Sequence, residues 1–289
     1  MIDLSNVTFI IPLRIDTDDR LRNIILSTSF LLNNFDCKVI VKESDEMKKF
    51  EMWALPTIKS ISDTSNLTYQ YEENHDDHFH RTRLLNEMVL DSETDIVVNY
   101  DSDIILPIKS YVMAKEMLDN KEADVVYPYK FGARGERKVV LNTSIEAVDD
   151  LDSLLKQPIV QEFTTTWKPE VLDQSYGYAP HSNGEGWAEY GMVQFFNKQV
   201  YMDGYLENEN FIAYAPEDVE RHHRWLTLGY KIGRVENYAY HMEHKRTPNS
   251  SYNNPFMMRN NQLWDYLKGL SMNELIEYYE KQDYVRQKL

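Results

Sequence analysis

The feature that most constrains the fold is an alternation of short apolar runs with amphipathic segments. Residues 7–11 form a β-branched run that ends at Pro12, and residues 95–100 form a second such run. Residues 20–34 and 79–90 carry apolar side chains at helical spacing. Continuous apolar runs suit strands that are buried on both faces of a sheet. We therefore expect an α/β protein, with a doubly wound sheet between layers of helices.

The same patterns predict the remaining elements. Strands are expected at 37–41, 124–129, 191–196 and 231–235, and helices at 107–118, 217–228 and 271–288. Residues 43–49 are interpreted as a polar segment after the second strand. Residues 130–184 show no regular pattern and are interpreted as an insertion. We expect one domain over 1–249 that contains this insertion, followed by a helical extension over 250–289.

Composition limits what the chain can bind. Hydrophobic residues make up 42% of the 289 residues, which is enough for a sizeable core and argues against wholesale disorder. Asp and Glu number 47 against 31 Lys and Arg, so the net charge is -16. Nucleic acids and anionic membranes attract basic surfaces, so we expect neither as a direct partner. An anionic ligand would need a local cation or arginines to offset this charge.

Three features favour the cytoplasm. Cys37 is the single cysteine, so no internal disulfide can form and a reducing compartment is favoured. The first residues lack the basic and apolar pattern of a signal peptide. No apolar run approaches the roughly 20 residues that a membrane span needs. We therefore expect a cytoplasmic protein.

An acidic triplet, Asp101-Ser102-Asp103, follows the apolar run at 95–100. Residues two apart on an extended chain project to the same side, so Asp101 and Asp103 can bind a divalent cation and the ribose or diphosphate beside it. The apolar pattern resumes at 104–106, and a cation would offset the cost of burying the two acids. The alternative is that they are solvated loop acids.

Two histidines could complete such a site. His241 and His244 offer imidazole nitrogens, and a set of aspartate oxygen with histidine nitrogen favours Mn²⁺ over Ca²⁺. His244 is the preferred ligand, whereas His241 is either a ligand or a support for His244. His75, His78 and His80 fit no common structural zinc spacing and are interpreted as loop histidines.

Other charged residues could act on a ligand. Glu217 and Asp218 begin a predicted helix, where they either complement the helix dipole or supply a general base. Arg14 follows the first strand and Arg81 stands near Phe79. A guanidinium can bind phosphate oxygens with two hydrogen bonds, or it can simply balance charge in an acidic protein.

In order along the chain, these motifs resemble the β-1,4-galactosyltransferase group and the related bacterial chondroitin-polymerase and N-acetylgalactosaminyltransferase domains. Residues 10–14 resemble the opening nucleotide-binding strand of that family, and residues 79–86 resemble its Phe-Asn-Arg-Ala-Lys-Leu-Leu-Asn segment. Asp101-Ser102-Asp103 resembles its Asp-Val-Asp metal motif, in which the second aspartate is the direct ligand.

Three later segments extend the resemblance to residues 7–246, with the insertion unmatched. Residues 190–193 resemble the strand beside the donor sugar, and residues 241–244 fall where the family has its remaining metal ligands. Residues 214–218 stand in place of Trp-Gly-Gly-Glu-Asp, whose aromatic stacks on the acceptor and whose aspartate is the proposed base. Here Tyr214 is a smaller platform and Ala215-Pro216 replaces Gly-Gly, which leaves the acceptor open.

The resemblance implies a GT-A glycosyltransferase with a Rossmann-like mixed sheet, in which the insertion at 130–184 shapes the acceptor cleft. It implies inverting transfer from a UDP-sugar to a hydroxyl of a glycan or other acceptor, with Mn²⁺ or Mg²⁺ as cofactor. The family's secretory anchor and disulfides are missing, which agrees with a bacterial or viral cytosolic enzyme. The implied site comprises the metal ligands Asp103, His244 and His241, the donor-binding residues Pro12, Arg14, Phe79, Arg81, Asp101, Ser102, Asp103 and Gly191, the acceptor-binding Tyr214, and the catalytic residues Asp218 and Glu217.

Two other functions stay open. A nucleotidyltransferase also uses acids and a metal on a doubly wound sheet. It usually has a Gly-rich basic loop after the first strand, where this chain has Asp16-Thr17-Asp18-Asp19. The second alternative is a relative that binds a nucleotide sugar or carbohydrate without turnover.

Overall fold

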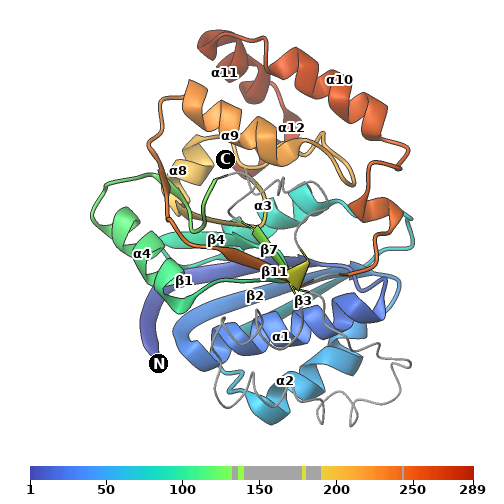
Figure 1. The fold of residues 1–289 in the computed structure, drawn as a ribbon. Helices are drawn as coiled ribbons and strands as arrows, with labels where there is room; N and C mark the ends of the chain where they lie inside the picture. Colours follow the sequence, from blue (N-terminus) through green and yellow to red (C-terminus); the bar gives the residue numbers. More distant parts are fainter. Residues whose placement is uncertain (132–135, 140–177, 180–189, 243) are drawn as a thin grey trace.

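The computed structural model describes residues 1–131, 136–139, 178–179, 190–242 and 244–289 (Figure 1). The predicted insertion at 130–184 lies largely outside the described residues. Within the described chain, no helix is both long and apolar enough to cross a membrane.

The main sheet has seven strands in the order β10-β6-β9-β4-β1-β2-β3. Strand β9 runs antiparallel to its neighbours β4 and β6, and the other pairs are parallel. The predicted α/β class with a doubly wound mixed sheet is confirmed. The strands are β1 (Ile2–Leu13), β2 (Phe35–Asp45), β3 (Leu67–Glu73), β4 (Ile96–Tyr100), β6 (Val125–Tyr127), β9 (Val193–Asn197) and β10 (Ile232–Arg234).

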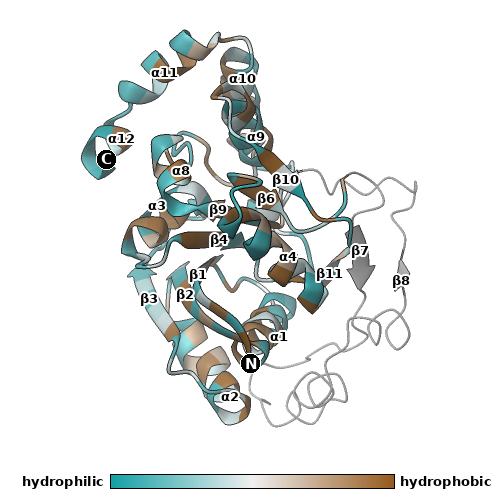
Figure 2. Cartoon of the chain, turned by 90° about the vertical axis from the view of Figure 1, so that its left-hand side faces the viewer, coloured by the Kyte–Doolittle hydropathy of each residue, from teal (hydrophilic) through white to brown (hydrophobic). Residues whose placement is uncertain are grey.

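The central strands form because their side chains are apolar on both faces. Phe9 and Ile11 of β1 are buried on one face, and Ile10 is buried on the other. Strands β4, β6 and β9 are likewise mostly hydrophobic (Figure 2). The predicted runs at 7–11 and 95–100 therefore lie at the centre of the sheet.

Helices cover both faces of this sheet (Figure 1). The side chains of α1, α2 and α4 share a core with one face, and those of α3, α8 and α9 share a core with the other. Predicted helices at 20–34, 79–90, 107–118 and 217–228 are confirmed with small shifts at their ends. The helices are α1 (Asp18–Asn34), α2 (Leu55–Ile61), α3 (Arg81–Asp91), α4 (Ile108–Asp119), α8 (Lys198–Asp203) and α9 (Glu217–Thr227), with a π-helical turn at Phe50–Ala54 before α2.

The polar segment predicted at 43–49 is partly wrong, because β2 continues to Asp45. Glu43 and Asp45 are buried there, and each has partners that offset its burial. Glu43 accepts hydrogen bonds from the Tyr69 hydroxyl and the Phe50 amide, and Asp45 accepts one from the Ile15 amide.

A second sheet, in the order β5-β11-β7-β8, brings two distant segments together. Its strands are β5 (Ile104–Ile105), β7 (Glu136–Val139), β8 (Tyr178–Ala179) and β11 (Ala239–Met242). Strands β5 and β11 are antiparallel, with His241 opposite Ile104. The chain that follows the acidic triplet is therefore paired with the chain that carries the histidines.

The carboxyl-terminal part contains a 3-10 turn (Pro248–Ser250) and the helices α10 (Met257–Leu267), α11 (Met272–Glu280) and α12 (Asp283–Lys288). The predicted single helix at 271–288 is therefore two helices. The break allows Tyr279 and Val285 to pack in one small core with Phe211. Ser271 begins α11 with a capping box, as its position predicts. The division at residue 249 stays a prediction.

Candidate functional site

A cleft lies at the carboxyl ends of β1 and β4, where ligands of doubly wound sheets bind. Its empty volume, which includes open solvent, is about 880 Å³. The sequence-predicted site residues that line it are Pro12, Arg14, Phe79, Arg81, Asp101, Ser102, Asp103, Tyr214, Glu217, Asp218, His241 and His244. Gly191 lines an adjoining groove that shares Tyr214, Glu217 and Asp218 with the cleft.

The β5–β11 pairing positions the metal-ligand candidates. The Asp103 carbonyl accepts a hydrogen bond of 2.8 Å from the Met242 amide. The His244 Nε2 atom lies 3.1 Å from Asp103 Oδ2, and His241 Nε2 lies 3.8 Å from Oδ1. Helix α1 holds the acidic triplet and β11 in place, since Asn23 donates to the Met242 carbonyl and Ser27 donates to the Ser102 carbonyl.

These three side chains fit a divalent transition metal. One ligand atom from each of Asp103, His241 and His244 lies within 4.8 Å of the others. The Nδ1 atom of His244 is 3.0 Å from the Lys245 carbonyl oxygen. A proton on Nδ1 would satisfy that carbonyl and leave the Nε2 lone pair facing Asp103, as in many metal sites.

The two acids of the triplet have opposite pKa shifts. Burial raises the pKa of Asp101, and Asp103 adds to the rise, although Arg81 opposes it. Burial also acts to raise the pKa of Asp103, but the charges and hydrogen bonds of His241 and His244 outweigh it and hold that pKa well below its usual range. Asp103 is therefore an anion, and a bound metal ion would take the place of the imidazole protons that face it.

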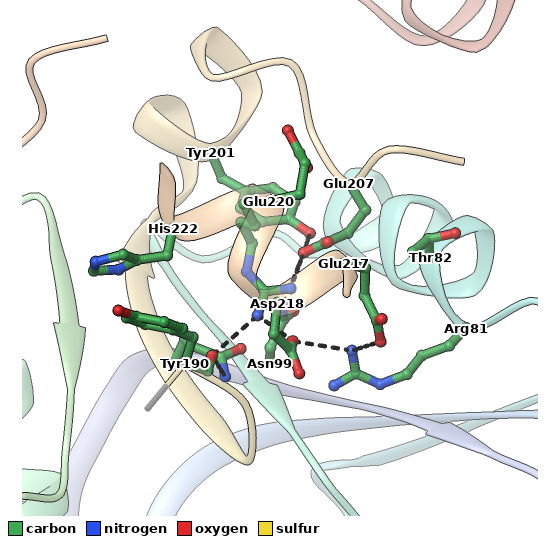
Figure 3. A network of polar contacts seen from close by, with 12 residues as sticks. Arg81, Thr82, Asn99, Tyr190, Tyr201, Glu207, Glu217, Asp218, Glu220 and His222 are labelled. Carbon is green, nitrogen blue, oxygen red and sulfur yellow. Dashed lines mark hydrogen bonds and ion pairs between the residues drawn. The ribbon is translucent and has the colours of Figure 1, made fainter. Parts of the chain in front are cut away.

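Arg81 lies close to three carboxyl groups, two of which, those of Glu217 and Asp218 on α9, are seen beside it in Figure 3. It is the first residue of α3, and its Nη2 atom lies 2.7 Å from Asp101 Oδ1. Its Nη1 atom lies 3.6 Å from Glu217 and 3.7 Å from Asp218. The sequence predicted each of these residues separately, and the structure places them around one guanidinium.

Glu217 is more deeply buried than its neighbour Asp218. It is 7% exposed, and burial together with the charge of Asp218 raises its pKa to about 8. Its Oε2 atom and the Nη1 atom of Arg81 are buried and have no hydrogen-bond partner among the described residues. A buried polar atom without a partner is costly, so this pair of atoms is suited to a ligand.

Asp218 faces the cleft with a side chain that is 29% exposed. A Cβ atom at Gly191 would lie 2.8 Å from Asp218 Oδ2, so a larger residue there would displace the carboxylate. The neighbouring Met192 has a φ of 65°, a conformation that costs energy for a residue with a side chain and is often found near functional sites.

The adjoining groove extends the cleft beyond Asp218 toward the carboxyl-terminal helices. Tyr214 meets Tyr252 there in an edge-to-face contact, with 5.0 Å between ring centroids. Tyr190, Met257 and Asn261 also line this groove. Aromatic side chains beside carboxyl groups are suited to a ligand with an apolar face and hydroxyls.

The sequence did not predict several lining residues, namely Asp16, Arg20, Ala213, Arg246, Asn249 and Ser250. Arg20 forms an ion pair with Asp16 and lies 3.8 Å from Asp103 Oδ2. Its place at the start of a helix after the first strand is a usable signal, because such helix ends border ligand sites. Asn249 and Ser250 carry no comparable signal.

The histidines interpreted as loop residues do not converge. His75 pairs with Glu73 at the surface, and His78 packs against Phe256. His80 caps α3 by accepting a hydrogen bond from the Arg83 amide. Arg14 lines the cleft, where its Nη1 atom also donates to the Asp76 carbonyl.

The sequence matches no protein-family model and no curated protein. Among solved structures, a mannosyltransferase of Pyrobaculum calidifontis in complex with GDP-Man and Mn²⁺ is 12% identical, with a TM-score of 0.55 over 98% of this chain and 72% of that one. TarS residues 1–349 of S. aureus with UDP-GlcNAc is also 12% identical, with a TM-score of 0.47 over 85% and 60% of the two chains. The catalytic domain of Drosophila β1,4-galactosyltransferase 7 with xylobiose is 12% identical, with a TM-score of 0.42 over 90% and 80%.

At these identities the likeness concerns the fold alone, and of these three structures the mannosyltransferase has the TM-score that supports an argument. Its alignment spans nearly the whole of this chain, and the seven-stranded mixed sheet flanked by helices is common to GT-A enzymes. The chain therefore has the fold of the GT-A glycosyltransferases.

Proposed function

We propose that this chain is a metal-dependent glycosyltransferase that moves a sugar, with inversion, from a nucleotide-diphosphate sugar to a hydroxyl of a glycan or other acceptor. The observation that carries the proposal is one cleft in which Asp103 and His244 lie beside the Arg81–Asp101 pair and Asp218. UDP is preferred as the nucleotide through the family resemblance. The GDP-Man and Mn²⁺ of the mannosyltransferase agree with a nucleotide sugar and a metal as ligands.

The proposed cofactor is Mn²⁺, or Mg²⁺ in its place. Asp103, His244 and His241 would hold it, and imidazole ligands favour Mn²⁺ of the two. When bound, it would neutralise the diphosphate and the charge that develops on the leaving nucleotide. The residues that hold it are negative or neutral, so this cation is what lets an acidic protein bind an anionic donor.

The donor is proposed to lie along the cleft between Arg14 and Arg81. Both guanidinium groups line it, and Pro12 and Phe79 give apolar surface for the nucleoside. Asp101 and Ser102 lie beside the metal ligand and can contact the ribose or the diphosphate. Gly191, which has no side chain, lets the Asp218 carboxylate lie close to the backbone beside the proposed site of the donor sugar.

Asp218 is the proposed general base. It would take the proton from the acceptor hydroxyl while that oxygen attacks the anomeric carbon and the nucleoside diphosphate leaves. Glu217 is unsuited to this role near neutral pH, because its pKa of about 8 keeps it mostly protonated. A protonated Glu217 would instead donate a hydrogen bond, and Tyr214 would support the acceptor in the adjoining groove.

A panel of UDP- and GDP-sugars, incubated with the protein and Mn²⁺, tests this function by release of the nucleoside diphosphate. We expect release with one donor by the wild type, and a loss of about 10²–10⁴-fold in Asp218→Asn with donor binding kept. Wild-type turnover by Asp218→Asn would clear Asp218 of the base role. Binding of a donor without any release, in the presence of many acceptors, would favour a non-catalytic sugar-binding protein.

A further inference from the structure

Asp218 is paired with a fully buried cation, Arg221. The Arg221 side chain has 0% of its surface exposed, and it stands one helical turn after Asp218 on α9. Its Nη2 atom lies 2.6 Å from Asp218 Oδ1 and also donates to the Tyr190 carbonyl at 3.4 Å. One guanidinium therefore joins the start of α9 to the chain that enters β9.

Arg221 also pairs with a second acid, which, unlike Asp218, is fully buried. Its Nη1 atom lies 2.8 Å from Glu207 Oε1, and the Glu207 side chain is itself fully buried. The Tyr201 hydroxyl and the Asn99 amide donate to the same Glu207 oxygen at 2.5 and 3.1 Å. Burial acts to raise the pKa of Glu207, but the charge of Arg221 and the Tyr201 hydrogen bond outweigh it and lower that pKa. Glu207 thus remains a fixed anion.

These contacts restrict the Asp218 carboxylate on both oxygens. Oδ1 accepts from Arg221, and Oδ2 lies against Gly191, where a Cβ atom would be only 2.8 Å away. The Gly191 carbonyl in turn accepts a hydrogen bond from the Tyr129 hydroxyl. A rotation of the Asp218 carboxylate would break the Arg221 hydrogen bond.

We propose that Arg221, backed by Glu207, is a positioning residue that fixes the orientation of the Asp218 carboxylate in the cleft. The expected effect on turnover rests on the proposed function, whereas the effect on the orientation of the Asp218 carboxylate does not. An acid that must accept a proton during attack works only in the correct orientation, and misplacement by about 1 Å can cost on the order of 10²-fold in rate. Arg221 sets that orientation without touching the donor or the acceptor.

The same helix provides a matched control. Arg224 is also fully buried on α9 and pairs with a buried glutamate, Glu220, at 3.0 Å. This pair contacts the carboxyl-terminal helices instead, since the Tyr279 hydroxyl donates to Glu220 and the Arg224 guanidinium lies over the Tyr279 ring. Removing it should disturb α9 as much as removing the Arg221 pair does, without a contact to Asp218.

The experiment compares two variants in which both members of a pair become glutamine, because that leaves no buried charge without a partner. One combines Arg221→Gln with Glu207→Gln, and the other combines Arg224→Gln with Glu220→Gln. We expect kcat of the first to fall by about 10²-fold while the KM for the nucleotide sugar stays within about twofold. The control should lose similar thermal stability and keep kcat. Equal kcat in the two variants would overturn the proposal.

A conservative variant and a structural readout complete the test. Arg221→Lys keeps the charge but loses the two-pronged geometry, so it should fold and recover only part of the lost kcat. A crystal structure of the Arg221 and Glu207 double variant should show the Asp218 carboxylate turned from its place beside Gly191. An unmoved carboxylate would refute the positioning role. If the carboxylate moves in the variant but the wild-type protein transfers no sugar, the proposed function is refuted and the positioning role stands.

Discussion

Glu217 and Asp218 are adjacent in sequence, yet their environments separate their chemistry. Glu217 is buried and its Oε2 atom has no hydrogen-bond partner among the described residues, whereas Asp218 is partly exposed and pairs with Arg221. The sequence predicted both acids because they begin a helix, and it ranked Asp218 as the base through the family resemblance. It could not predict the difference in burial, since that depends on how α9 meets Arg81 from α3.

The first prediction concerns the effect of Glu217 on stability at different pH. Its pKa of about 8 exceeds the ordinary value of 4.5, so the folded state binds more protons than the unfolded state between these values. The contribution of Glu217 to stability therefore falls as the pH rises through this window. We expect Glu217→Gln to gain stability relative to the wild type between pH 5 and about pH 8. Thermal melts across this range measure it, and a constant difference would contradict the assigned pKa.

Some residues of the site could be predicted from the sequence, and others could not. The motif order predicted Asp103, His241 and His244, and the structure brings their ligand atoms together. Arg221 follows Asp218 by three residues, a spacing that places two side chains on one face of a helix. This spacing could therefore have predicted the Asp218–Arg221 pair from the sequence. Glu207 was not predictable, because it belongs to no recognisable motif and comes close to Arg221 only in the folded chain.

At the scale of elements, the site depends on two pairings that bring distant segments together. Strands β5 and β11 pair the acidic triplet with the histidines, and the segment before β9 lies against the start of α9. Apolar patterns predicted the long strands and helices of the main sheet. They missed β11, because His241 interrupts its apolar pattern and its register depends on contacts with β5.

Other elements were missed for related reasons. Strand β3 lies at the edge of the sheet and is mostly half-exposed, so it lacks an apolar run. The predicted helix at 271–288 has a helical pattern throughout, and only packing around Phe211 shows why it breaks. The sequence therefore predicted the buried centre of the fold better than its edges and its terminal helices.

The second prediction tests the contact between the segment before β9 and α9. In Gly191→Ala, the new Cβ atom would meet Asp218 Oδ2 and displace it, so we expect turnover to fall by about 10-fold or more. Gly269→Ala is the matched control, because its Cβ atom would find no atom closer than 3.6 Å. Steady-state kinetics of both variants decide the matter, and full turnover by Gly191→Ala would show that Asp218 tolerates the displacement.

At the scale of the whole molecule, charge is the main constraint on ligand binding. A chain with a net charge of -16 repels a diphosphate unless cations intervene. In the described cleft the side chains of Arg14, Arg20, Arg81 and Arg246 are positive, but two of them already pair with Asp16 and Asp101. Because these pairs neutralise part of the arginine charge, a bound metal ion would supply the positive charge that the diphosphate still needs.

The third prediction follows from this balance. UDP alone should raise the melting temperature little, whereas UDP with Mn²⁺ should stabilise the protein by about 2.7 kcal/mol at a ligand concentration of 100 Kd. Asp103→Ala should lose the stabilisation that depends on Mn²⁺. Thermal-shift measurements on both proteins test it, and equal stabilisation of Asp103→Ala would remove Asp103 from the metal site.

The most direct test of the account is anomalous diffraction from crystals of the wild-type protein grown with Mn²⁺ and UDP. The account predicts a manganese peak within bonding distance of Asp103 and His244, in contact with the diphosphate. A well-ordered UDP in the cleft with no manganese peak beside Asp103 would contradict it.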